Sequence, residues 1–186
     1  GSLRTMGEAA TAEEWLREAL DGELAGEAEI WDLWAALNFA DLQRSPEEML
    51  ATLPAGEGQR HCQDIRWLLE RLQVGEPIRI NCGGGEYEPA DGPGWGRDRF
   101  FHGGHVYKSG DASFEGDLAG TGDEALHQTE REFGDDDDSP AYRVPLPPGR
   151  YRLSLHFSGI RFKEIGKRRF HVRIEGQEVL KEYEPF

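Results

Sequence analysis

The sequence predicts an α+β protein in which a small N-terminal helical bundle precedes an antiparallel β-sandwich of the jelly-roll type. Apolar residues recur with the 3.6-residue period of a helix up to about residue 76, and alternation with a period of two dominates after it. Glycine follows the same division, because seven of the 24 glycines precede residue 78 and 17 follow it. We therefore expect two domains, an acidic helical region over residues 1–76 and a β-rich region over residues 77–186.

Three or four helices are expected in the first region. Residues 11–14 (T-A-E-E) form a capping-box pattern, which predicts that the first helix begins there. An apolar stripe at helical spacing predicts a second helix over about residues 27–43. Residues 45–48 (S-P-E-E) place a serine cap and a first-turn proline at the start of a third. Residues 59–73 carry the inward-facing apolar positions of a fourth helix.

Four of the five tryptophans lie in this helical region. We interpret them as core residues, with an exposed partner surface as the alternative. The helices carry no catalytic or metal-binding pattern, so the bundle could act as an adaptor, a dimerisation unit or a brace for the second region.

Short segments of alternating apolar and polar residues make up the second region. Turns rich in glycine and proline separate them, and no helical pattern intervenes, which is typical of a β-sandwich or jelly roll. The expected strands cover residues 77–82, 142–146, 151–157 and 169–175, and a hairpin turn at Gly176 leads into residues 178–180.

The charge balance excludes several classes of partner. The chain has 21 Lys and Arg residues against 36 Asp and Glu residues, a net charge of −15. Such a surface repels phosphate backbones and anionic membranes, so we expect no nucleic-acid and no membrane partner. No apolar run approaches the ~18 residues that a membrane span needs. The two cysteines, Cys62 and Cys82, form no C-x-x-C motif, and we expect reduced, buried thiols.

A series of motifs in the second region occurs in the order found in a known family. They are I-N-C-G-G at residues 80–84, W-G-R-D at 95–98, L-A-G-T-G-D-E-A-L-H-Q-T-E-R at 118–131, Y-R-V-P-L at 142–146, G-R-Y-R-L-S-L-H-F at 149–157, G-K-R-R-F-H-V at 166–172 and I-E-G at 174–176. In these motifs residues 78–186 resemble a malectin domain, a carbohydrate-binding β-sandwich.

The resemblance also implies a sandwich that is incomplete at its C-terminus, because the family continues with further strands after the last motif. An open sheet edge and core must be covered. Either the domain is shortened here, or another chain or a second copy completes the sheet, or the helical region covers the gap.

The resemblance implies carbohydrate-binding residues as well, since the family uses aromatic side chains on loops and an aspartate near the C-terminus. Phe162 keeps one aromatic position of the family. Arg161 and Glu132 stand where the family has aromatics and could hydrogen-bond hydroxyls instead. Tyr107 is the nearest candidate for a further loop tyrosine. Trp95, the sole tryptophan of this region, is either a stacking platform or a packed corner.

These residue types suit a sugar, which presents apolar C–H faces together with hydroxyl groups. The expected function is therefore non-catalytic recognition of an oligosaccharide, with a glucose-type sugar as one option. No nucleophile elbow, zincin motif or P-loop is present, so we expect neither an enzyme nor a cofactor. The alternative is a protein-interaction or oligomerisation module on a malectin-like scaffold that has lost sugar binding.

Three further features are interpreted as structural. Glu130 and Arg131 should point to opposite faces of a strand and so take separate partners, which favours a scaffold role for residues 129–131. Residues 135–138, four consecutive aspartates, are expected to be a solvated loop because they cannot converge on one calcium ion. His102 and His105 are the one histidine pair at metal spacing, and we expect no metal site.

The expected compartment depends on which feature is weighed. Sugar binding favours a secreted or periplasmic protein. Free cysteines and the absence of a visible signal peptide favour the cytoplasm.

Overall fold

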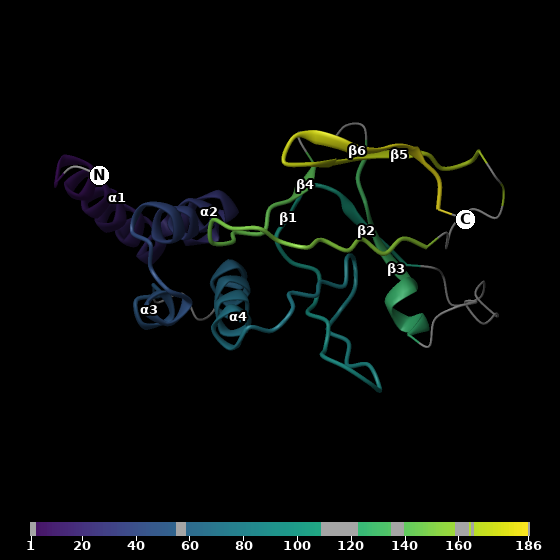
Figure 1. Ribbon diagram of the computed structural model, residues 1–186, viewed down its shortest axis with the longest axis horizontal. Coiled ribbons are helices and arrows are strands. Elements are labelled where there is room, and N and C mark those ends of the chain that lie inside the picture. The colour runs from purple at the N-terminus through teal and green to yellow at the C-terminus, as the bar shows by residue number, and fades with distance from the viewer. Residues whose placement is uncertain are drawn as a thin grey trace.

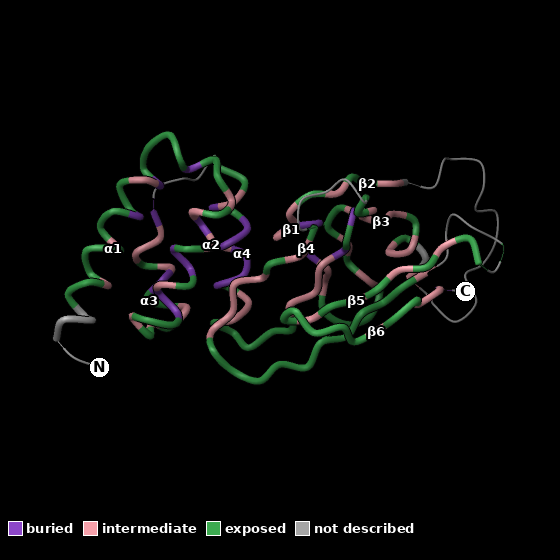
Figure 2. The backbone as a smooth tube through the Cα atoms, turned by 90° about the horizontal axis from the view of Figure 1, so that it is seen from above, coloured by how far each residue is buried: buried purple, intermediate pink, exposed green. Residues whose placement is uncertain are grey.

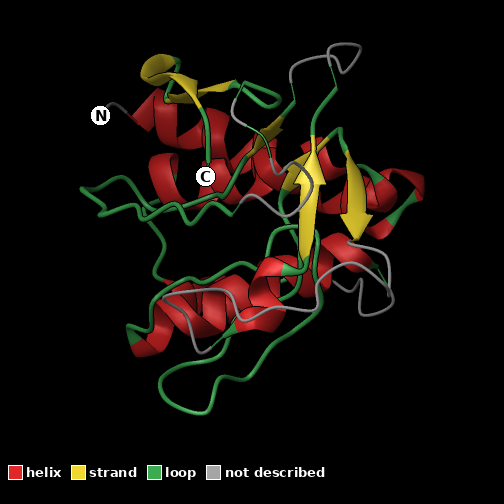
Figure 3. Ribbon diagram, turned by 90° about the vertical axis from the view of Figure 1, so that its right-hand side faces the viewer, coloured by secondary structure: helices red, strands yellow, loops and turns green. Residues whose placement is uncertain are grey.

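The computed structural model describes residues 3–54, 59–108, 123–134, 140–158, 164 and 166–185. The helices gather at one end of the molecule and the strand pairs at the other (Figure 1). The α+β class is thereby confirmed. The strands form separate two-stranded antiparallel pairs (Figure 3), so the predicted sandwich and jelly roll stay predictions.

The helical region follows the expected order. It contains α1 (Leu3–Asp21), the 3₁₀ turn η1 (Glu23–Gly26), α2 (Ala28–Ala36), the π-helical turn η2 (Leu37–Asp41), α3 (Pro46–Ala51) and α4 (Arg60–Val74). The predicted second helix is confirmed as the continuous run of α2 and η2, and the predicted fourth helix is confirmed as α4.

Local signals explain where these helices begin and end. The Ser45 side chain accepts from the Glu48 amide, and the Glu48 carboxylate accepts from the Ser45 amide at 2.8 Å, so the predicted capping box is confirmed. Helix α4 ends at Gly75, which has φ +72°. The predicted helix start at Thr11 is wrong. Helix α1 already begins at Leu3, and the Thr11 hydroxyl donates to the Gly7 carbonyl at 3.0 Å within the helix.

Buried residues concentrate in the helical region (Figure 2). Trp31 and Trp34 pack edge to face with their ring centroids 6.3 Å apart. Trp67 is also buried, whereas Trp15 is 54% exposed, so the core interpretation is confirmed for three of these tryptophans and wrong for Trp15. The core comprises Leu16, Leu20, Trp31, Trp34, Ala35, Phe39, Met49, Cys62, Ile65 and Leu69.

The two cysteines differ in their surroundings. Neither cysteine takes part in a disulfide. Cys62 is buried in the helical core, but Cys82 is exposed, which corrects the expectation that both are buried.

The strand pairs of the second region bring distant segments together. β1 (Phe101–His102) pairs with β4 (Ala141–Tyr142), β2 (His105–Lys108) pairs with β3 (Thr129–Glu132), and β5 (Phe170–Ile174) pairs with β6 (Gln177–Tyr183). The 3₁₀ turn η3 (Glu124–His127) precedes β3. The predicted hairpin is confirmed, with Gly176 at φ +76° in the turn between β5 and β6.

Two predicted strands do not form in the part of the chain that the structure describes. Residues 77–82 contribute only an isolated bridge between Ile80 and Gly96. Residues 151–157 pair with no strand, although apolar and polar residues alternate along them. Alternation is not sufficient, because a strand also needs a neighbouring strand to bond its backbone N–H and C=O groups. Of the predicted strand over residues 142–146 only Tyr142 lies in a strand, β4, and Pro145 cannot donate to a ladder.

The unpaired segment carries an apolar row, which we define as Tyr151, Leu153, Leu155 and Phe157. These side chains are between 38% and 59% exposed. At one end the Phe157 ring lies 5.1 Å from that of Phe170 and 5.3 Å from that of Tyr183, and at the other the Tyr151 hydroxyl donates to the Pro147 carbonyl at 2.6 Å.

We predict that Gly83→Ala destabilises the protein far more than Gly85→Ala. Gly83 has φ +80°, and a Cβ there would overlap the backbone of Glu130 in β3. At Gly85 an added Cβ meets nothing within 4 Å. Urea unfolding should show a loss of more than about 2 kcal/mol for Gly83→Ala and less than about 0.5 kcal/mol for Gly85→Ala. Equal midpoints for the two variants would contradict the close approach of Gly83 to β3.

Candidate functional site

The pairing of β2 with β3 places two predicted site residues on one face. Tyr107 lies opposite Glu130 and His105 lies opposite Glu132, so all four side chains share one side of the ribbon. We call these four residues the β2–β3 face. His105 Nε2 lies 3.5 Å from Glu132 Oε2. The face thus combines one aromatic ring with two carboxylates and an imidazole, which can supply a platform and hydrogen-bond acceptors.

An ion pair positions this face from the side. The Arg168 guanidinium donates to Glu130 Oε2 at 2.5 Å, and both side chains are at least three-quarters buried. Arg168 precedes β5, so the contact ties the β2–β3 ribbon to the β5–β6 hairpin. One carboxylate of the face is therefore held in place, while Glu132 remains more exposed.

The opposite side of the same ribbon is anchored by Arg131. Its Nε and Nη2 atoms each lie 2.7 Å from Asp98 Oδ2, and its Nη1 donates to the Gly104 carbonyl at 2.9 Å. The Arg131 guanidinium carbon also lies 3.4 Å from the centroid of the Phe101 ring. Glu130 and Arg131 thus take separate partners on opposite faces, as predicted, and the contacts of Arg131 support a scaffold role for that residue.

Asp98 divides its carboxylate between two partners. While Oδ2 faces Arg131, Oδ1 accepts from the Tyr142 hydroxyl at 2.8 Å. Burial raises the pKa of Tyr142, and the neighbouring Cys82 and Asp98 raise it further, so the phenol stays protonated and keeps donating. Strands β3 and β4 are therefore joined through one buried carboxylate.

The glycine-rich motif at residues 80–84 packs onto this arrangement. The buried Asn81 donates from its side chain to the Gly85 carbonyl at 2.9 Å, which closes the turn. The Asp98 amide donates to the Gly84 carbonyl at 2.9 Å. Gly83 lies directly against Glu130. Motifs that are far apart in the sequence therefore converge on one structural hub, defined as Asn81, Asp98, Arg131 and Tyr142.

Trp95 lies in a packed corner rather than on the β2–β3 face. Its backbone pairs with Tyr87, and the Arg79 guanidinium carbon lies 5.6 Å from its ring centroid. The His156 ring meets it edge-on at 5.7 Å. The Tyr87 hydroxyl in turn donates to Asp123 Oδ1 at 2.9 Å. These contacts favour the packed-corner interpretation, in which Trp95 braces the loop instead of stacking on a ligand.

The segment that carries Trp95 also joins the two regions of the chain. Arg97 donates to Asp64 Oδ1 of α4 at 2.5 Å, and Arg99 Nη1 lies 3.6 Å from the same oxygen. The Arg99 guanidinium carbon lies 3.9 Å from the centroid of the Trp67 ring. Burial lowers the pKa of Arg99 to about 10, so it keeps its charge at neutral pH. Gly96 lets the backbone lie flat on Trp67, because a Cβ would overlap the indole.

The other predicted site features fall outside the residues described. Arg161, Phe162 and the aspartates at 135–138 belong to this group. His105 and Arg168 were missed as members of the site, because their proximity to Glu132 and Glu130 depends on strand register and on a contact 38 residues apart. Among the described residues, no group of three or more His, Cys, Asp and Glu side chains is placed to hold a metal ion, and no helix has the length and hydropathy of a membrane span.

Comparison with known proteins gives one match. The family model described as Malectin domain matches residues 77–186, which is more than half of the chain. Neither a curated protein nor a solved structure matches the chain.

We predict that Arg131→Lys destabilises the protein although the charge is kept. A lysine cannot hold Asp98 through two nitrogens and reach the Gly104 carbonyl at the same time. The free energy of unfolding should fall by about 2–4 kcal/mol, measured by urea unfolding. Arg173→Lys on the exposed side of β5 is the matched control and should change it by less than about 0.5 kcal/mol. Equal losses in both variants would refute the anchoring role of Arg131.

Proposed function

The chain belongs to the malectin domain family, and on that premise we propose that it binds an oligosaccharide reversibly and without cleaving it. Malectin domains are carbohydrate-binding modules in general. The family match over residues 77–186 is the observation that carries the proposal. The non-catalytic part of the proposal is supported by the absence of any catalytic motif in the sequence.

We assign the sugar to the β2–β3 face. The Tyr107 ring offers an apolar surface for the C–H face of a pyranose, and Glu132 and Glu130 can accept hydrogen bonds from its hydroxyls. Arg168 holds Glu130 in one orientation before any ligand arrives, which reduces the entropy lost on binding. Arg161 and Phe162 remain proposed members of the same site. Trp95 is assigned to bracing its loop.

A neutral sugar fits this face better than an anionic ligand. Two carboxylates stand on it, and the chain has a net charge of −15, so a phosphorylated or sulfated glycan would be repelled. Hydroxyl groups, in contrast, donate readily to carboxylates. We therefore favour an uncharged, glucose-type oligosaccharide.

We predict that Tyr107→Leu weakens oligosaccharide binding about tenfold, because leucine keeps the apolar bulk but removes the flat ring. The measurement is a titration of the full chain with maltotriose, followed by amide chemical shifts. We expect a dissociation constant on the order of 1 mM for the unaltered protein. Trp15→Ala removes an exposed aromatic side chain on α1 and is the control, for which we expect unchanged affinity.

Two results would count against this assignment. The first is a glycan array with no binding at high protein concentration, which would remove the carbohydrate function itself. The second is equal affinity in Tyr107→Leu and in the unaltered protein, which would remove the β2–β3 face as the site.

A specific observation favours the alternative function as a protein-interaction or oligomerisation module. The apolar row, Tyr151 to Phe157, is exposed, and its segment pairs with no strand among the described residues. Such an edge can pair with the same segment of a second copy.

If this alternative holds, light scattering should show a dimer that persists in excess maltotriose. Leu155→Asp should then convert the dimer to a monomer, because it places a charge in the middle of the row. The control is Lys181→Asp on the exposed face of β6, which should leave the mass unchanged. A monomer at all concentrations would rule out self-association through the apolar row.

A further inference from the structure

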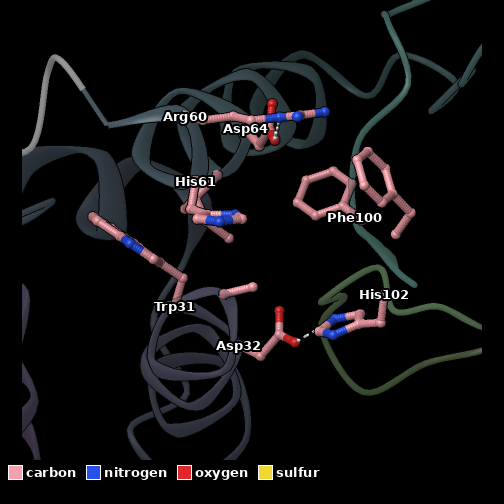
Figure 4. A pocket seen from close by; sticks show the side chains of 10 residues that line it. Trp31, Asp32, Arg60, His61, Asp64, Phe100 and His102 are labelled. Atoms are coloured by element: carbon pink, nitrogen blue, oxygen red, sulfur yellow. Dashed lines mark ion pairs between the residues drawn. The ribbon is translucent and has the colours of Figure 1, made fainter. Parts of the chain in front are cut away.

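A cavity of about 230 Å³ lies between the helical region and the start of the β-region. It shares no residue with the β2–β3 face. Its walls come from α2, α4, Phe100 and strand β1 (Figure 4). The lining residues are Ala28, Trp31, Asp32, Arg60, His61, Asp64, Ile65, Phe100, Phe101 and His102.

Aromatic side chains form much of the wall. Trp31 is buried, and its indole N–H donates to the Ala25 carbonyl at 2.8 Å, which fixes the ring beside the cavity. Phe100 and Phe101 are consecutive, and in a regular strand they would point to opposite faces. Both nevertheless line the cavity. Phe100 has φ +62°, a left-handed conformation that is strained for a bulky residue. This conformation of Phe100 allows the rings of Phe100 and Phe101 both to face the cavity.

Polar groups also line the cavity. His102 Nε2 lies 3.2 Å from Asp32 Oδ2, and His102 Nδ1 lies 3.6 Å from Glu29 Oε1. The second oxygen of Asp32 points into the cavity, toward the imidazole of His61 (Figure 4). Burial raises the pKa of Asp32, while His102 and Arg143 oppose the shift. Arg60, at the rim, is half-exposed and lies 4.8 Å from the centroid of the Phe101 ring.

The buried carboxylate of Asp64 is already compensated, because it is paired with Arg97 and Arg99. Asp32 Oδ2 faces the His102 ring, 3.2 Å from Nε2. A cationic ligand would therefore gain nothing from Asp64, and an anionic ligand would be repelled by Asp32. The volume corresponds to about eight water molecules at ~30 Å³ each, enough for one small ring but not for a chain of rings.

We propose that this cavity binds a single uncharged polyol ring, such as one monosaccharide unit, stacked against Phe100 and hydrogen-bonded by Asp32, His61 and Arg60, with the buried Trp31 forming the wall beneath. The site lies between the two regions of the chain, so the helical region contributes directly to ligand recognition. It is independent of the β2–β3 face, and either assignment can fail without the other.

The test is a titration of the full chain with D-glucose, followed by the indole N–H resonance of Trp31. We expect a saturable shift with a dissociation constant on the order of 1 mM. Ala28→Leu fills the cavity from the first turn of α2 and should weaken this binding at least tenfold. Ala36→Leu, on an exposed position of the same helix, is the control and should leave it unchanged.

A second variant covers the case in which Ala28→Leu does not fold. Asp32→Asn keeps the shape of the side chain but removes a charged acceptor, and it should weaken glucose binding about tenfold. Tyr107→Leu should leave glucose binding in the cavity intact while it weakens maltotriose binding, which separates this site from the β2–β3 face. A shift of the Trp31 resonance that does not saturate overturns the proposal. Equal glucose affinity in Ala28→Leu and Ala36→Leu, or in Asp32→Asn and the unaltered protein, also overturns it.

Discussion

The segment at residues 96–99 links the helical region to the strands of the β-region. Because side chains alternate along it, Arg97 and Arg99 reach Asp64 in α4, while Asp98 between them reaches Arg131 in β3. The charged groups involved are largely buried. Removing one partner would leave the others uncompensated in a low-dielectric surrounding, at a cost of about 3–5 kcal/mol. The alternation therefore sets both the contact between the two regions and the position of the strands that carry the β2–β3 face.

The contacts of residues 96–99 help to position both candidate ligand sites, the β2–β3 face and the cavity. Arg131 holds β3 from one side, so Glu130 and Glu132 are left on the other side, facing Tyr107. Phe100, the next residue along the segment, bends the chain toward α2 and closes the cavity between the two regions. The helical region thus forms one wall of the cavity. Its Asp64 carboxylate also pairs with Arg97 and Arg99, on either side of Asp98 in the hub. A helical adaptor that did not contact the β-region would make neither contribution.

The sequence predicted what depends on neighbouring residues and missed what depends on distant ones. The capping box at Ser45 and the end of α4 near Gly75 could be predicted because the residues that determine each lie within one helical turn. Thr11 misled because a hydroxyl inside a helix can bond back to the carbonyl of the preceding turn, as it does to Gly7. The family motifs identified Tyr107 and Glu132 as candidates. Their placement on one face required the register of β2 and β3, and the cavity required contacts between residues 28–65 and 100–102.

The charge of the chain and the chemistry of its candidate sites agree with each other. Carboxylates stand at both sites, Glu130 and Glu132 on the β2–β3 face and Asp32 in the cavity, within a protein of net charge −15. Such a field repels polyanions over roughly 8 Å at physiological ionic strength but acts little on a neutral polyol. Carboxylates also accept stronger hydrogen bonds from hydroxyl groups than neutral acceptors do. The acidity from which we expect no nucleic-acid partner therefore also favours an uncharged sugar at the two proposed sites.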